Sequence, residues 1–318
     1  MELMKSRAFA PCAAILLVSP FLAGTVCAQE TDREGARPAI GTEVFVSTDS
    51  DDTDITRLAV DFDLRNRGPN DRLGLRVEKA WYSPQGEETV DRDRIFLQLG
   101  EEIANWQLRA RVGTDMHTII GAISANDDAA FRKEVFLERD IVETPLGLDE
   151  TPIYSTFGGA AIDVPVNDRN VINLLAGYQT FTGENERIHL RGTYIHVVKP
   201  DWGLSLQLRG RYFHSSEPRE FDYYSPEYYA QVLPVVQVRR FFGDGWMVLG
   251  AGGIGVQRDS DSDWAQSNFG QLKVESPRGD RNWSVNGELI YTDTPSNSAA
   301  IGSGYNYFQA LVGARRRF

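Results

Sequence analysis

The chain has 318 residues, with 33 lysines and arginines against 45 aspartates and glutamates, which gives a formal net charge of −12. Net acidity argues against a nucleic-acid partner, because contact with a phosphate backbone requires a basic surface. The hydrophobic fraction of 42% argues against wholesale disorder, and the mean hydropathy of −0.34 does not fit a bundle of membrane helices. A membrane β-barrel remains compatible with these averages, because its apolar surface occupies alternate residues.

The first 28 residues have the pattern of a secretory signal peptide. Lys5 and Arg7 provide the positive start, a short apolar core follows, and residues 26–28 fit a cleavage site. A lipoprotein signal is the lesser alternative, because the bulky Val26 precedes Cys27. Both cysteines of the chain lie before the predicted cleavage point, so we expect a mature protein without disulfides or thiol chemistry.

The chain then repeats a single pattern from residue 39 to residue 318. Segments of about ten residues alternate apolar with polar or small side chains, and Gly, Pro, Asp and Asn separate the segments. In residues 57–65, one face is apolar (Leu58, Val60, Phe62, Leu64) and the other is charged (Arg57, Asp61, Asp63, Arg65). We therefore expect one all-β domain over 39–318, preceded by a short periplasmic segment at 29–38.

This pattern predicts sixteen strands, at about 39–48, 55–65, 72–82, 92–100, 105–114, 117–125, 131–141, 152–165, 170–180, 187–198, 202–212, 227–240, 245–257, 266–276, 281–292 and 304–318. Two folds accommodate such a series. A soluble β-sandwich places the apolar faces inside, whereas an outer-membrane barrel places them outside, against lipid. Three features of the sequence favour the barrel.

The first feature is an alternation in the length of the connections. Tight turns follow even-numbered segments, as at 66–71, 199–201 and 242–245, whereas longer loops follow odd-numbered segments, as at 213–226 and 292–303. Short periplasmic turns and longer outer loops are typical of outer-membrane barrels.

The second feature is the position of aromatic residues at the predicted strand ends. Tryptophans begin odd-numbered segments on the periplasmic side, and aromatic residues end odd-numbered segments on the opposite side. The first set is Trp106, Trp202, Trp246 and Trp283, and the second is Trp81, Tyr178, Tyr212 and Tyr291. Amphipathic rings favour the headgroup level of a bilayer, so this banding predicts two girdles.

The third feature is the final segment, which ends on an aromatic residue. Phe308, Val312 and Phe318 share its apolar face, in a pattern that resembles the signal for the outer-membrane assembly machinery. Arg316 departs from the apolar pattern, although so near the end it can snorkel to the interface. Together the features predict a closed antiparallel barrel of about sixteen strands in a Gram-negative outer membrane, in contact with lipid and lipopolysaccharide.

A barrel of this size encloses a lumen wide enough for water, which favours transport over anchoring. By the alternation, the charged side chains that line the pore are Arg57, Asp61, Asp63, Arg72, Arg76, Glu78, Arg109, Arg111, Arg187, Arg191, Arg209, Arg211, Arg239, Glu275 and Glu288. Such charges can select which solute passes. The plainer interpretation is that they pair across strands and keep the interior wet.

Three motifs carry a family resemblance. Residues 223–229 read Tyr-Tyr-Ser-Pro-Glu-Tyr-Tyr, residues 209–214 read Arg-Gly-Arg-Tyr-Phe-His, and residues 138–144 read Glu-Arg-Asp-Ile-Val-Glu-Thr. The combination resembles the C-terminal porin domain of bacterial exopolysaccharide export proteins, of the cellulose and poly-N-acetylglucosamine type, and the related YaiO-type stand-alone barrels. The resemblance covers most of the mature chain and is most recognisable at 209–260.

This resemblance implies a sixteen-stranded pore through which a nascent polysaccharide leaves the cell passively. The export proteins carry a helical-repeat scaffold before the barrel, whereas here only the segment at 29–38 precedes the first predicted strand. The expected partners are therefore a separate periplasmic scaffold and an inner-membrane glycan synthase.

Four tyrosines near the predicted outer rim are candidates for glycan contact: Tyr223, Tyr224, Tyr228 and Tyr229. Aromatic faces can stack on the apolar faces of sugar rings, so the cluster could form a platform for a passing chain. The alternative is an ordinary girdle at the membrane interface.

An enzyme is the less favoured class. The histidines at 117, 189, 196 and 214 have no recognisable nucleophile setting, and their spacing fits no metal motif. The acidic runs at 49–54 and 259–263 lack the spacing of a calcium-binding loop. We expect no catalytic residue, no metal and no cofactor, and we expect the glycine-rich stretch at 250–255 to permit bending or close packing in the wall.

The leading functional hypothesis is passage of a secreted polysaccharide through the barrel. The first rival is a general diffusion porin for small solutes, which a constricting loop folded into the lumen would favour. The second rival is a structural or adhesive surface barrel whose function lies in its outer loops.

Overall fold

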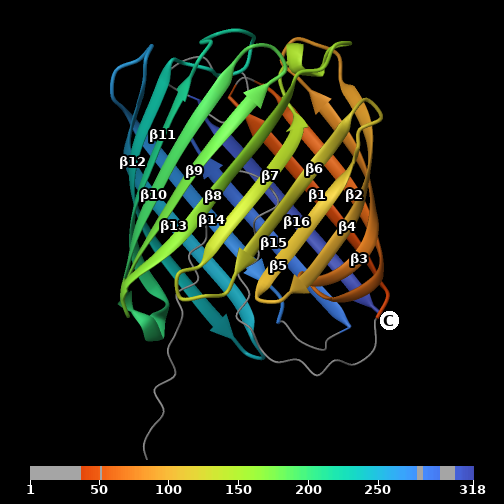
Figure 1. The fold of residues 1–318 in the computed structure, drawn as a ribbon, viewed down its shortest axis with the longest axis vertical. Coiled ribbons are helices and arrows are strands. Elements are labelled where there is room, and N and C mark those ends of the chain that lie inside the picture. The colour runs from red at the N-terminus through yellow and green to blue at the C-terminus, as the bar shows by residue number, and fades with distance from the viewer. Residues whose placement is uncertain (1–36, 51, 278–281, 294–304) are drawn as a thin grey trace, which may run out of the picture.

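The computed structural model describes residues 37–50, 52–277, 282–293 and 305–318. Within them, sixteen antiparallel strands form one closed barrel, in which each strand pairs with its sequence neighbours and the last pairs with the first (Figure 1). The expected all-β class and strand number are confirmed. The predicted signal peptide and most of the segment at 29–38 lie outside the described residues.

The strands are β1 (Ala39–Asp49), β2 (Asp54–Gly68), β3 (Asp71–Ser83), β4 (Val90–Ile103), β5 (Trp106–Thr114), β6 (Ile119–Asp127), β7 (Lys133–Ile141), β8 (Tyr154–Asn167), β9 (Asn170–Phe181), β10 (Glu186–Lys199), β11 (Leu204–Ser215), β12 (Tyr228–Phe242), β13 (Trp246–Asp259), β14 (Ala265–Glu275), β15 (Trp283–Thr292) and β16 (Tyr307–Arg317). Two short 3-10 turns accompany them, η1 (Leu146–Leu148) and η2 (Pro200–Trp202). No helix in the described part of the chain is long and apolar enough to cross a membrane.

The strand predicted at 117–125 begins two residues later, at Ile119. The carboxylate of Asp115 accepts hydrogen bonds from the backbone N–H groups of His117 (3.1 Å) and Thr118 (3.0 Å). A side chain that satisfies backbone donors in this way forms a local turn in place of the sheet ladder. Residues 117 and 118 therefore belong to the loop and not to β6.

The alternation of side chains divides the wall into an apolar outer face and a largely polar inner face. In β12, Val232 and Val236 are 44% and 51% exposed, whereas Leu233 and Val235 are 4% and 2% exposed. Exposed apolar side chains recur at alternate positions on strand after strand. An apolar belt around a closed barrel is the surface that a lipid bilayer requires.

Short turns lie at one end of the barrel and long loops at the other, as expected. Two residues join β2 to β3, β4 to β5 and β8 to β9, whereas residues 142–153 and 216–227 connect β7 to β8 and β11 to β12. At the short-turn end, the N–H of Phe318 donates to the carbonyl oxygen of Pro38 (2.9 Å). We refer to this end as periplasmic and to the loop end as outer (Figure 1).

Aromatic side chains occupy both ends of the strands, in the two bands that the sequence predicts. Trp106, Trp246 and Trp283 begin β5, β13 and β15, and Trp202 ends η2 one residue short of β11. Near the outer ends, Tyr178, Tyr212 and Tyr291 are 46%, 40% and 40% exposed. Such rings suit the headgroup level at each surface of a bilayer.

The glycine-rich stretch at 250–255 lies in β13, where two strands approach closely. The neighbouring β12 contains Pro234, which has no N–H to donate to the ladder. A Cβ on Gly253 would lie 2.4 Å from the carbonyl oxygen of Pro234, and a Cβ on Gly255 would lie 2.1 Å from that of Val232. The expectation of close packing in the wall is confirmed at these two glycines.

One charged residue that we expected on the inner face lies on the outer face. The β2–β3 register shifts between Asp63 and Arg65, and a bulge of this kind reverses the alternation beyond it. Arg65 therefore forms ion pairs with Glu101 (2.5 Å) and Asp71 (2.9 Å) near the periplasmic end. Strict alternation from the sequence did not anticipate the extra residue.

The outer face of β4 allows a direct test of the lipid-facing assignment. Leu97 is 54% exposed near the middle of the strand, and Ile103 is 59% exposed at its periplasmic end. We expect Leu97→Arg to lower the free energy of unfolding in lipid vesicles by about 2–4 kcal/mol, and Ile103→Arg to lower it by about 1 kcal/mol or less, because the cost of a charge falls toward the interface. Urea titration monitored by tryptophan fluorescence measures both, and equal costs would contradict the assignment.

Candidate functional site

The structure places all fifteen predicted pore-lining side chains on the inner face of the barrel. Arg57, Asp61, Asp63, Arg76 and Glu78 are each less than one-tenth exposed. Their low exposure means that they contact other side chains more than open water. Part of the inner face is therefore a packed network of charges, as the plainer interpretation of the sequence holds.

Two aspartates of β2 anchor the periplasmic part of this network. Asp61 lies 2.8 Å from Arg315 and 3.2 Å from Arg72, and it accepts a hydrogen bond from the amide of Gln98 (2.6 Å). Asp63 lies 2.7 Å from the Nε atom of Arg72. Strands β16, β2, β3 and β4 thus contribute to one cluster, in which each buried carboxylate is neutralised by guanidinium groups from its neighbours.

The network continues across β3 and β4 to β7. Arg76 lies 2.5 Å from Glu43 and 2.9 Å from Glu78, and Arg94 lies 3.0 Å from Glu78. The other nitrogen of Arg94 donates to both oxygens of Asp140, at 2.7 and 2.8 Å. Acidic and basic side chains therefore alternate around this side of the lumen, so the charges there largely cancel.

Four members of this network were missing from the set predicted from the sequence: Glu43, Arg94, Asp140 and Arg315. The alternation contains the signal for Arg94, because it precedes Phe96 and Gln98 on the same face of β4. The sequence gives no such signal for Asp140. Because β7 carries charges at three consecutive positions, 138–140, only the contact with Arg94 identifies Asp140 as a member of the network. The contact between Arg94 and Asp140 depends on the closed barrel, which brings the side chains of β4 and β7 together.

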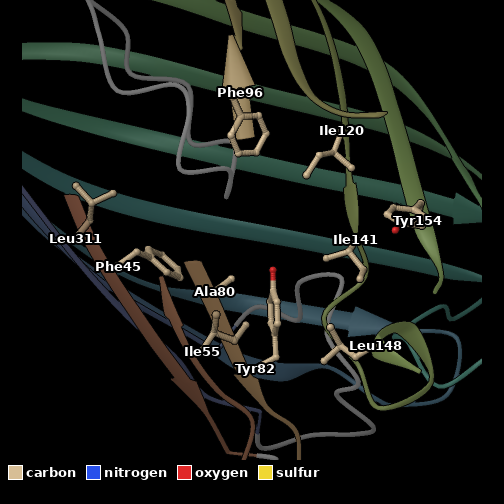
Figure 2. Close-up of a cluster of buried hydrophobic side chains, with 10 residues drawn as sticks. All are labelled: Phe45, Ile55, Ala80, Tyr82, Phe96, Ile120, Ile141, Leu148, Tyr154 and Leu311. Atoms are coloured by element: carbon tan, nitrogen blue, oxygen red, sulfur yellow. The ribbon is translucent and has the colours of Figure 1, made fainter. Parts of the chain in front are cut away.

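The outer mouth of the barrel is narrowed by the loop at 142–153. Glu143 in this loop forms an ion pair with Arg57 of the inner wall, and Arg92 of β4 donates to the carbonyl oxygen of Leu148 (3.0 Å). The Leu148 side chain, 2% exposed, packs in a cluster that includes Ile55 and Tyr82 of the inner wall (Figure 2). Polar and apolar contacts together hold the loop inside the barrel.

The loop at 216–227 also folds inward, and the carboxylate of Asp222 forms hydrogen bonds that connect it to the loop at 142–153. Asp222 accepts a hydrogen bond from the hydroxyl of Thr144 (2.7 Å) and another from the backbone N–H of Leu146 (2.7 Å). In the same loop, the carbonyl oxygen of Tyr224 accepts a hydrogen bond from Arg187 of β10 (2.7 Å). The two loops thus form one connected structure across the mouth.

The tyrosines proposed for glycan contact are not presented as a platform at the rim. Tyr223, Tyr224 and Tyr229 are 2%, 8% and 1% exposed, and Tyr228 is half-buried. The Tyr223 ring stacks on Phe181, with centroids 4.3 Å apart and an interplanar angle of 11°. The interface-girdle alternative is also wrong for the three buried rings, because they face the interior and not the lipid.

Each of these buried loop tyrosines has a partner for its hydroxyl group. Tyr223 accepts a hydrogen bond from Asn185 (2.9 Å), and Tyr224 donates to Asp259 (2.5 Å). Burial raises the pKa of Tyr223 to about 12, and burial with the bond to Asp259 raises the pKa of Tyr224 well above its ordinary value. Both hydroxyls are therefore protonated at neutral pH and act as structural contacts of the inward loop.

A cavity of about 200 Å³ lies inside the barrel. Its charged lining includes Asp61, Arg76 and Arg111 together with Glu138 of β7. The described residues contain no group of three or more His, Cys, Asp or Glu side chains placed to hold a metal ion. What this interior offers a solute is a set of hydrogen bonds and charges.

No family model matches this chain, and no curated protein matches it. Among solved structures, a bacterial polysaccharide outer membrane secretin has a TM-score of 0.64 at 13% identity, over 88% of this chain and 98% of that one. The protein has the fold of an outer-membrane porin-like barrel.

More distant structures have TM-scores below 0.5. They include OccK5 of Pseudomonas aeruginosa, with a TM-score of 0.43 at 6% identity over 89% of this chain and 98% of that one. The KdgM porin in complex with disordered oligogalacturonate has a TM-score of 0.35 at 10% identity, over 87% and 99%. The similarity to the polysaccharide secretin supports the expected resemblance, and at 13% identity it does so for the fold.

The predicted assembly signal lies on the outer face of β16. Phe308, Val312 and Phe318 are 40%, 58% and 59% exposed. The guanidinium of Arg316 lies over the rings of Trp283 (5.5 Å) and Phe318 (5.1 Å), which fits a side chain at the periplasmic interface. Recognition by the assembly machinery remains a prediction.

The charge network predicts a large effect for one isosteric change. We expect Asp61→Asn to lower the free energy of unfolding by about 3–5 kcal/mol, because it leaves buried guanidinium groups without their shared carboxylate. Asp71→Asn is the matched control, because Asp71 pairs with arginines at the partly exposed periplasmic turn, and we expect little change. Urea titration in lipid vesicles compares the two variants, and a similarly small effect for Asp61→Asn would show that the network is not buried.

Proposed function

We propose that this protein conducts a secreted polysaccharide passively across the outer membrane of a Gram-negative cell. The observation that carries the proposal is the amide-rich inner wall. Buried amide side chains project inward from many strands: Gln98, Gln107, Asn126, Asn173, Gln179, Gln207, Gln231, Gln237 and Gln309. The fold that the chain shares with a polysaccharide secretin supports the same proposal.

Amide side chains suit a hydroxyl-rich chain because each can both donate and accept hydrogen bonds. In the structure they bond to one another and to hydroxyl groups: Gln207 donates to Gln237 (3.1 Å), and Gln231 donates to Ser267 (2.7 Å). A sugar hydroxyl can replace either partner at little net cost, because one hydrogen bond is exchanged for another. Many such contacts favour sliding over deep binding.

In this mechanism no residue is catalytic. The barrel supplies a polar path through an apolar membrane, and the driving force comes from continued synthesis at the inner membrane. A periplasmic scaffold and a glycan synthase are the proposed partners on the inner side. Lipid, lipopolysaccharide and the outer-membrane assembly machinery are the proposed partners of the barrel wall.

The inward loops favour a second candidate, a general diffusion porin for small solutes. A constricting loop inside the lumen was the feature that we expected of such a porin, and the loops at 142–153 and 216–227 occupy the mouth. For polysaccharide export, the same loops must open when the chain arrives. The two candidates therefore differ in whether the mouth is a permanent filter or a movable closure.

The link between the two loops can be tested by its removal. We expect Asp222→Ala to raise single-channel conductance in planar bilayers at least twofold, because it removes both hydrogen bonds that join the loops. Glu217→Ala is the matched control, because Glu217 is an exposed acidic residue of the same loop. Identical conductance of Asp222→Ala and the wild type would mean that this contact does not restrain the mouth.

Deletion of the gene tests the export function itself. We expect secreted polysaccharide to fall and periplasmic polysaccharide to accumulate, with both restored by the wild-type gene. The measurement is the sugar content of the culture medium and of the periplasmic fraction. Unchanged secretion combined with reduced uptake of small solutes would refute export and support the diffusion porin.

A further inference from the structure

The inner wall formed by β10 and β11 carries a set of arginines that differs from the network on β2–β4. Arg187 and Arg191 lie on β10, and Arg209 and Arg211 lie on β11, all on the inner face. We call these four side chains the arginine cluster. The register of the strands shows what surrounds them.

On the opposite side of the lumen, cross-strand neighbours have opposite charges. Asp61 of β2 faces Arg76 of β3, and Glu78 of β3 faces Arg94 of β4. Opposite charges directly across an antiparallel pair stabilise the sheet, and like charges destabilise it. The β2–β4 wall therefore follows the arrangement that a merely structural network would have.

In the arginine cluster the neighbours do not compensate the charge. Arg211 lies directly opposite another arginine, Arg191, on β10, and opposite the neutral Gln231 on β12. Arg209 lies opposite Thr193 and Leu233, which are also neutral. No cross-strand partner of either arginine on β11 is an acid.

In the part of the chain that the structure describes, Arg209 and Arg211 also form no ion pair with a more distant acid. Among the described residues, no carboxylate lies within ion-pair distance of Arg187, Arg209 or Arg211. Glu138 compensates part of the charge of Arg191, so the uncompensated charge lies on Arg209 and Arg211 of β11. Positive charge therefore predominates on this wall.

Neutral groups hold these guanidinium groups in place. Arg209 donates twice to the Gln207 amide oxygen (2.9 and 2.8 Å) and lies over the Phe269 ring at 4.8 Å. Arg211 lies over the rings of Phe213 (5.7 Å) and Tyr229 (5.6 Å), and its Nε atom has no hydrogen-bond partner in the described part of the chain. Aromatic faces orient a guanidinium group without neutralising it, so its capacity to bind an anion is retained.

Exposure separates the structural arginine from the accessible ones. Arg187 is 1% exposed and bonds to Ser215 and to the carbonyl of Tyr224, so it serves the inward loop. Arg209 and Arg211 are partly exposed on the inner face. These two side chains lie two residues apart on one strand, which places them about 7 Å apart along the wall.

We propose that Arg209 and Arg211 bind the acidic groups of the transported molecule, so that the barrel carries an acidic glycan in preference to a neutral one. This inference rests on the proposed function and specifies its substrate class. A guanidinium group matches a carboxylate, sulfate or phosphate in a two-pronged contact. An uncompensated pair of such groups on one wall favours entry of anions, whereas the opposite wall is already neutralised.

The test uses the purified full-length barrel in planar bilayers with three sugar trimers as probes: trigalacturonate, maltotriose and the glucosamine trimer. We expect trigalacturonate to block the wild-type current at a concentration at least tenfold lower than maltotriose does. This preference should weaken at high salt, because mobile ions screen exposed charges. The glucosamine trimer, which is cationic, should be the weakest blocker.

The variant Arg209→Gln/Arg211→Gln should lose the preference for the acidic trimer. The matched control is Arg67→Gln/Arg169→Gln, which removes the same charge from exposed positions at the periplasmic end and should keep the wild-type preference. Heat-modifiable migration on gels verifies that each variant is folded. If the double variant does not fold, Arg211→Lys retains the charge without the two-pronged contact and should show a reduced preference.

The outcomes separate this inference from the proposed function. Equal block by trigalacturonate and maltotriose, or an undiminished preference in the folded variant, would overturn the role of the arginine cluster and leave glycan transport standing. Absence of block by every trimer would count against glycan transport itself. In that case the reversal potential in a potassium chloride gradient still tests the arginine cluster. Anion selectivity that is the same in the wild type and in the double variant would also overturn the inference.

Discussion

The pairing of β1 with β16 is the constraint on which the rest of this structure depends. Eleven residues of each strand are in register, from Ala39 opposite Arg317 to Asp49 opposite Tyr307. In lipid an unpaired backbone group has no water to bond, so an open edge would be too costly and the sheet must close. Closure in turn gives every strand residue either the outer face or the inner face.

Much of this architecture follows from the sequence because closure and alternation leave few choices. The strand number, the two aromatic bands and the inward direction of the fifteen charged positions all depend on a period of two. Where the alternation of side chains is interrupted, the predicted side-chain direction or strand boundary is wrong. The bulge beside Arg65 moves its side chain to the outer face, and the Asp115 turn removes two residues from β6.

The loops could not be predicted in the same way, because their positions depend on contacts between distant parts of the chain. The Tyr-Tyr-Ser-Pro-Glu-Tyr-Tyr segment resembles an exposed rim in sequence. Its first tyrosine stacks on Phe181, and the aspartate before it bonds to Thr144. Local composition identifies neither partner. The sequence alone therefore does not distinguish a segment that folds into the barrel from one that extends outward.

The bonds of Asp222 to the loop at 142–153 also affect how the mouth moves. One carboxylate receives bonds from two groups of the other loop, and that loop is in turn held to the wall through Glu143 and Leu148. Displacement of either loop therefore breaks contacts of both. Coupling of this kind produces a cooperative transition between two states and not a graded series of widths, so recordings from single molecules should show discrete levels of current.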